Sequence, residues 1–86
     1  MKVGDIVIST YGHDMGDWFI VKQLDGDYVY LVDGKNRPIE KPKKKNLKHI
    51  VATNKTASDL IERLVGEQKI QNAELRKTLK FFKEQF

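Results

Sequence analysis

The sequence contains no cysteine, only two prolines and no long apolar run. Without cysteine, the chain has neither disulfides nor thiolate metal ligands to support its core. Its two histidines, His13 and His49, are too few to fill a tetrahedral zinc site by themselves. We therefore expect no metal and no cofactor. We also expect no membrane span, because a spanning helix needs about 20 apolar residues.

Signals for export and for catalysis are missing as well. The sequence MKVGDIVIST at the amino terminus has neither the apolar region nor the cleavage site of a secretory signal, so we expect a cytoplasmic protein. Ser9 and Ser58 lie in no nucleophile-elbow pattern, and no phosphate-binding glycine loop is present. Asp25 and Asp27 lack the spacing of a calcium loop, because Val29 stands at the third ligand position. The sequence predicts that the protein is not an enzyme.

What the chain does contain suffices for one small folded domain. Its 86 residues are 40% hydrophobic and 33% charged, a balance typical of globular rather than disordered proteins. The charge is unevenly distributed, since residues 1–34 hold two basic and six acidic side chains. The following segment reverses the sign.

Residues 34–49, GKNRPIEKPKKKNLKH, are the most basic part of the chain. Their basic side chains are Lys35, Arg37, Lys41, Lys43, Lys44, Lys45 and Lys48, against the single acid Glu40. The segment carries a charge of +6 in a protein whose formal net charge is +4. Pro38 and Pro42 disfavour helix, so we expect a semi-rigid, extended segment. Such a local charge favours a polyanionic partner, most simply RNA; a solvated loop kept for solubility is the alternative.

β-Branched and aromatic stretches predict strands in the first part of the chain. The predicted strands are Asp5–Thr10, Trp18–Leu24, Tyr28–Val32 and Leu47–Ala52. Glycine-containing turns separate them, at Gly12–Gly16, Asp25–Asp27 and Asp33–Gly34. This spacing indicates a small antiparallel barrel. Apolar residues occur on both faces of the strands, so we expect part of the outer wall to be covered.

The last third of the chain has helical periodicity. Thr56 is a candidate N-cap for a first helix that ends at Gly66 and presents an apolar face made of Ala57, Leu60, Ile61, Leu64 and Val65. A second helix is predicted from Asn72, as its cap, with an apolar stripe of Leu75, Leu79, Phe82 and Phe86. We expect the first helix to pack on the barrel. The second helix either completes the core or serves a partner protein, and we favour partial docking with a free outer face.

The stretch Gly4–Gly34 resembles a KOW motif, with an alternating strand, a loop bounded by Gly12 and Gly16, and a second strand. It is most similar to the ribosomal L-fourteen-e class, through the loop GHDMG and the hairpin that ends LVDG. It also resembles short bacterial KOW-domain proteins with a KPKKKxLKH run, here Lys41–His49. Two positions differ from the usual motif, which often has lysine where this chain has Met15 and glycine where it has Phe19.

The resemblance implies a mainly β fold: a small SH3-like barrel over residues 1–53, which include the basic segment, and a helical extension over residues 54–86. It also implies a noncatalytic, ribosome-associated or ribosomal-protein-like function in translation, with ribosomal RNA as the partner. The seven basic side chains named above would contact phosphates, with Tyr11, His13 and His49 nearby. Tyr11, Trp18, Tyr28 and Tyr30 could stack on an unpaired base, although packing is the simpler role for all four. Tyr11 is the best candidate among them, because it borders the glycine loop. The alternative function is a protein-interaction adaptor of the transcription or translation machinery that uses the barrel and the C-terminal helix.

Overall fold

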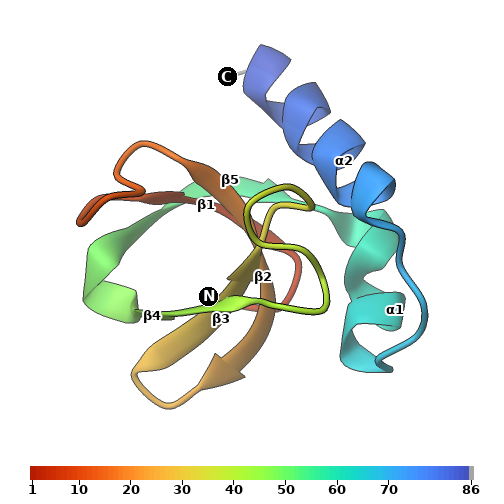
Figure 1. The fold of residues 1–86 in the computed structure, drawn as a ribbon, viewed down its shortest axis with the longest axis horizontal. Coiled ribbons are helices and arrows are strands. Elements are labelled where there is room, and N and C mark those ends of the chain that lie inside the picture. Colours follow the sequence, from red (N-terminus) through yellow and green to blue (C-terminus); the bar gives the residue numbers. More distant parts are fainter. Residues whose placement is uncertain (86) are drawn as a thin grey trace.

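A computed structural model describes residues 1–85 of the chain. A five-stranded antiparallel sheet in the order β4-β3-β2-β1-β5 is followed by two short helices (Figure 1). The strands are β1 (Asp5–Ser9), β2 (Trp18–Asp25), β3 (Tyr28–Val32), β4 (Lys43–Asn46) and β5 (Ile50–Thr56), and the helices are α1 (Ile61–Val65) and α2 (Asn72–Glu84). The sheet curls, but its edge strands β4 and β5 do not pair with each other in the described residues, so the sheet is not closed.

The first three strands lie where the sequence predicts them. β3 has its predicted bounds, β1 ends one residue early and β2 one residue late. The loop between β2 and β3 contains Gly26 with a φ of 60°, a conformation that glycine adopts without steric cost. A register shift between Val21 and Gln23 makes Lys22 a bulge, and its ammonium donates to the carbonyl of Ile39 at 3.2 Å.

The pattern of the chain does not predict β4, whose residues are Lys-Lys-Lys-Asn. This strand forms by pairing with β3, from Leu31 opposite Lys43 to Tyr28 opposite Asn46. Because side chains alternate along a strand, Lys43 and Lys45 share the face of Leu31, and Lys44 lies on the opposite face. The predicted extended backbone is therefore confirmed over Lys43–Asn46, where the basic segment is a strand of the sheet.

The predicted strand Leu47–Ala52 is wrong over its first half. Residues Leu47–His49 form a 3₁₀ helix, because the Asn46 side chain accepts a hydrogen bond from the backbone N–H of Lys48 at 2.9 Å and starts a turn. The chain then continues as β5 to Thr56, three residues beyond residue 53, where the sequence places the end of the barrel.

Two predicted helix caps have other roles. Thr56 lies in β5, where its hydroxyl donates to the Asp5 carboxylate at 2.9 Å, and the first helical turn after it is a 3₁₀ helix, Ser58–Leu60. α1 follows and ends at Gly66, as predicted. Asn72 begins α2, but its side chain accepts from the backbone N–H of Ile39 at 2.7 Å instead of capping the helix.

Both faces of the sheet are buried, as the apolar pattern predicts. The inner face carries one core cluster, made of Val7, Phe19, Val21, Val29 and Leu31. The outer face carries a second cluster, in which Ile6, Ile20 and Val32 of the sheet pack with Ala57, Leu60, Leu64, Ile70, Leu75 and Leu79. Figure 1 shows both helices on one side of the curled sheet. The helical tail is therefore the cover that the strands require.

α2 docks with one face only. Leu75 and Leu79 are buried and Phe82 is partly buried, whereas Phe81 is 55% exposed. The two helices are joined by a bidentate ion pair in which the Arg63 guanidinium donates to both carboxylate oxygens of Glu74, at 2.9 and 2.7 Å. These hydrogen bonds lower the pKa of Glu74. The predicted contribution of Phe86 to the stripe lies outside the described residues.

The first helix gives a direct test of this packing. Leu64 is 3% exposed and its neighbour Val65 is 65% exposed on the same helix. We expect Leu64→Ala to lower the free energy of unfolding by about 2 to 4 kcal/mol, because it removes buried methyl groups and leaves a cavity. Val65→Ala is the matched control. Urea denaturation should show that it lowers the free energy of unfolding by less than about 0.5 kcal/mol. Equal losses in the two variants would contradict the packing.

Truncation tests the second helix. Removing residues 72–86 takes Leu75, which is 0% exposed, out of the outer-face cluster. We expect the truncated protein to lose its cooperative thermal transition, because the outer-face cluster that includes Ile20 and Val32 then loses part of its apolar cover. An unchanged transition would mean that α2 contributes nothing to the core.

Candidate nucleic-acid interface

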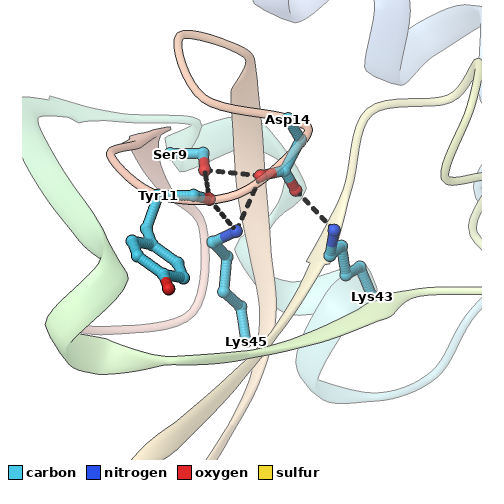
Figure 2. A network of polar contacts seen from close by, with 5 residues as sticks. All are labelled: Ser9, Tyr11, Asp14, Lys43 and Lys45. Atoms are coloured by element: carbon cyan, nitrogen blue, oxygen red, sulfur yellow. Dashed lines mark hydrogen bonds and ion pairs between the residues drawn. The ribbon is translucent and has the colours of Figure 1, made fainter.

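Asp14, in the loop between β1 and β2, is the centre of a polar network (Figure 2). The Lys45 ammonium donates to one of its carboxylate oxygens at 2.6 Å and to the carbonyl of Tyr11 at 2.7 Å. The Lys43 ammonium lies 2.8 Å from the other carboxylate oxygen. The Ser9 hydroxyl lies 2.6 Å from the carboxylate and 3.1 Å from the Tyr11 carbonyl, and its single proton bonds one of them at a time. Two lysines on the same face of β4 thus hold the loop between β1 and β2.

The network is shielded from water. The Asp14 side chain is 12% exposed, and Lys45 is 8% exposed. Burial acts to raise the pKa of Asp14, but the contacts from Lys43, Lys45 and Ser9 outweigh it and hold that pKa far below its ordinary value. Asp14 is therefore ionised at neutral pH and balances part of the lysine charge. Lys45, predicted as a phosphate contact, has its ammonium turned inward and engaged.

The structure brings two predicted site residues into direct contact. The rings of Tyr11 and His49 are stacked, with centroids 4.4 Å apart and an interplanar angle of 21°. Tyr11 is 62% exposed and His49 is half-buried. Next to His49 in the 3₁₀ helix, Lys48 is exposed. An aromatic pair with a lysine beside it is thus presented at the end of β4.

The other predicted residues are spread around this pair. His13, Arg37 and Lys43 line a small pocket of about 210 Å³ beside Asp14. On the opposite face of β4, the exposed Lys44 lies over the ring of Tyr28, 4.6 Å from its centroid. Lys35 and Lys41 are exposed in the connection between β3 and β4. The ten predicted residues therefore do not form one flat patch.

α2 docks on the connection between β3 and β4. The Arg76 guanidinium donates to the carbonyl of Gly34 at 2.6 Å. Gly34 has a φ of 77°, and a Cβ there would collide with the carbonyl of Asn72, so the close approach of helix and loop requires glycine. Lys35 lines an open groove of about 550 Å³ together with Lys80 and Lys83 of α2, and with the acids Asp17, Asp33 and Glu84. The helix thereby adds basic side chains next to the basic segment.

Sequence reasoning missed Asp14, the residue that organises this region. The available signal was a single acid inside the loop GHDMG, directly after His13 and three residues after Tyr11, together with the continuous lysine run at residues 43–45 later in the chain. Lys43 and Lys45 point to the same face only if Lys43–Asn46 is a strand, and the sequence pattern does not show that it is. The acid was therefore recognisable only after the strand pairing.

Within residues 1–85, the structure shows no group of three or more His, Cys, Asp or Glu side chains placed to hold a metal ion. In the same range, no helix combines the length and apolar character needed to cross a membrane. The Ser9 hydroxyl is 1% exposed and bonded within the Asp14 network, so it is not accessible to a substrate. The exposed lysines present positive charge, and the Tyr11–His49 pair presents stacked rings.

Comparison with known proteins adds no identification. No family model matches the chain, and a search of curated proteins finds no match.

The Asp14 network predicts a specific acid sensitivity. Because the pKa of Asp14 is lower in the folded than in the unfolded chain, its contribution to stability is present above about pH 4 and is lost as the pH falls through the folded value. We expect Asp14→Asn to lower stability at pH 7 by about 3 kcal/mol, because Lys45 keeps a buried charge without its partner. We also expect this variant to lose part of the steep decline of stability below pH 4.

Asp17→Asn is the matched control, since Asp17 is an exposed aspartate of the same loop. Urea denaturation at a series of pH values from 2 to 7 measures both variants. A wild-type and an Asp14→Asn protein with parallel pH profiles would show that Asp14 has no special role.

Proposed function

We propose that the protein is a noncatalytic RNA-binding module that works in the cytoplasm, in a ribosomal or translational setting. The observation that carries the proposal is a set of exposed lysines that have no acidic partner within residues 1–85. These are Lys35, Lys41, Lys44 and Lys48. They contrast with Lys43 and Lys45, which are both paired with the Asp14 carboxylate.

Unpaired cations gathered in one short segment repel one another, and a polyanion relieves that repulsion. Each lysine that neutralises a phosphate also releases condensed counterions, which favours binding at low salt. Arg37 adds a planar guanidinium suited to bidentate contact with a phosphate. RNA rather than DNA is proposed because of the resemblance to KOW-domain proteins.

The architecture also supports the proposal. An SH3-like barrel of the KOW type is built from a small, curled, antiparallel sheet, and the open five-stranded antiparallel sheet here, with a 3₁₀ helix between β4 and β5, is compatible with that fold. We propose this assignment for the sheet, with α1 and α2 as an extension that covers its outer face. The loop between β1 and β2, which carries Tyr11 and His13, then corresponds to the glycine loop of the motif.

Salt dependence of binding tests the proposal. With about four to six phosphates engaged, log affinity for a structured RNA should fall against log salt with a slope of roughly −3 to −5. We expect the triple variant Lys41→Gln, Lys44→Gln, Lys48→Gln to weaken binding and to make the slope shallower by about 2 to 3. Fluorescence anisotropy with a labelled ribosomal RNA fragment at several salt concentrations measures both quantities.

The control removes the same charge elsewhere, through Lys2→Gln, Lys69→Gln, Lys77→Gln, which changes three exposed lysines outside the basic segment. An equal effect of the two triple variants would show that only net charge matters. Equal affinity of the wild type for the RNA and for double-stranded DNA of the same length, at physiological salt, would contradict the choice of RNA.

A protein-interaction adaptor is the second candidate function, and one observation favours it. Phe81 is 55% exposed and forms an edge-to-face pair with Phe82, with ring centroids 5.3 Å apart. Both rings line a groove of about 510 Å³ with Ala57 and Leu60. If the protein is an adaptor that uses this groove, the Phe81→Ala variant should lose affinity for the protein partner and keep any affinity for RNA.

A further inference from the structure

We propose that Tyr11 is a stacking site for one unpaired nucleotide base, so that the protein selects RNA with a single-stranded loop or bulge over fully paired RNA. This inference rests on the proposed RNA-binding function and adds to it the kind of RNA that is bound. Three features of the structure carry it: the exposure of the ring, the fixed position of its backbone and the chemistry beside it.

The Tyr11 ring is stacked on one side and exposed to solvent. His49 covers one of its faces, at a centroid distance of 4.4 Å, yet the residue as a whole is 62% exposed. Among the aromatic residues of the described chain it is the most exposed. The exposed Tyr28, by contrast, has the Lys44 ammonium over its ring. Tyr11 therefore offers a ring face to solvent on a stack that is already formed.

The backbone of Tyr11 is fastened by the Asp14 network. Its carbonyl accepts a hydrogen bond from the Lys45 ammonium at 2.7 Å and lies 3.1 Å from the Ser9 hydroxyl. On the next residue back, the N–H of Thr10 donates to the carbonyl of His49 at 2.9 Å, so both stacked residues belong to one hydrogen-bonded unit. Figure 2 shows the ring projecting away from this network. Because the side chain is already ordered, binding a base costs little further conformational entropy.

The surroundings suit a nucleotide rather than an apolar ligand. Lys48 is exposed directly before His49 in the chain, so it adds a positive charge suited to a backbone phosphate at this end of β4. A paired base in an A-form helix is already stacked between its neighbours and offers only its edges. Away from the ends of a duplex, only an unpaired base can lie flat on Tyr11. Ring stacking is also tolerant of base identity, so selectivity for a loop over a duplex is expected without a strict sequence.

The test compares a labelled RNA hairpin that has an unpaired loop with a fully paired RNA duplex of the same length. We expect Tyr11→Ala to weaken binding to the hairpin by about 5- to 150-fold, the range that one base stacked on an aromatic ring provides. Binding to the duplex should change by less than about twofold. Tyr11→Phe keeps the ring and should keep the affinity, and Phe81→Ala is the matched control for loss of an exposed aromatic ring away from the basic segment.

A fluorescent base analogue, 2-aminopurine, placed in the hairpin loop gives a second readout. Its emission should be quenched on binding to the wild type and to Tyr11→Phe, and not on binding to Tyr11→Ala at saturating concentration. Equal losses on hairpin and duplex, or undiminished hairpin binding by Tyr11→Ala, would overturn the stacking site and leave RNA binding intact. A wild type that binds neither RNA would overturn the proposed function and the inference with it.

Discussion

The partly buried ion pairs of Asp14 with Lys43 and Lys45 are the constraint on which the rest of this surface depends. β4 pairs with β3 along the sheet, and the ammonium groups of Lys43 and Lys45 connect it to the loop between β1 and β2. A carboxylate shielded to 12% exposure is stable only when cations compensate its charge, and two lysines do so here. The loop that carries Tyr11 is therefore held against the strand that carries the lysines.

This arrangement divides the basic segment into two kinds of residue. Lys43 and Lys45 face inward and act as structural counterions, although in the sequence they are indistinguishable from Lys44 between them. Lys44 and the lysines of the flanking loops keep their charge on the surface. The number of phosphates that the protein can neutralise is then smaller than the count of basic residues, and the loop is ordered before any partner arrives.

The sequence predicted the elements that depend on local patterns. Strands rich in β-branched residues, the turn at Gly26 and the apolar face around Leu64 were correct, because periodicity and backbone preference determine them locally. β4 and the roles of Asp14, Thr56 and Asn72 were missed, because each depends on a partner at least 29 residues away in the chain or on a strand with no intrinsic preference for extended structure. The cover of the outer face was inferred correctly from apolar residues that had no other explanation.

Backbone and lysine-ammonium NMR spectra of isotope-labelled protein, titrated with a structured ribosomal RNA fragment, test the central claim most directly. The account predicts large shift changes in residues 11–13 and 48–49 and at the ammonium groups of Lys41, Lys44 and Lys48, while the ammonium signal of Lys45 stays close to its position in the free protein. Changes confined to the groove around Phe81, or loss of the Lys45 contact to Asp14 on binding, would contradict the account.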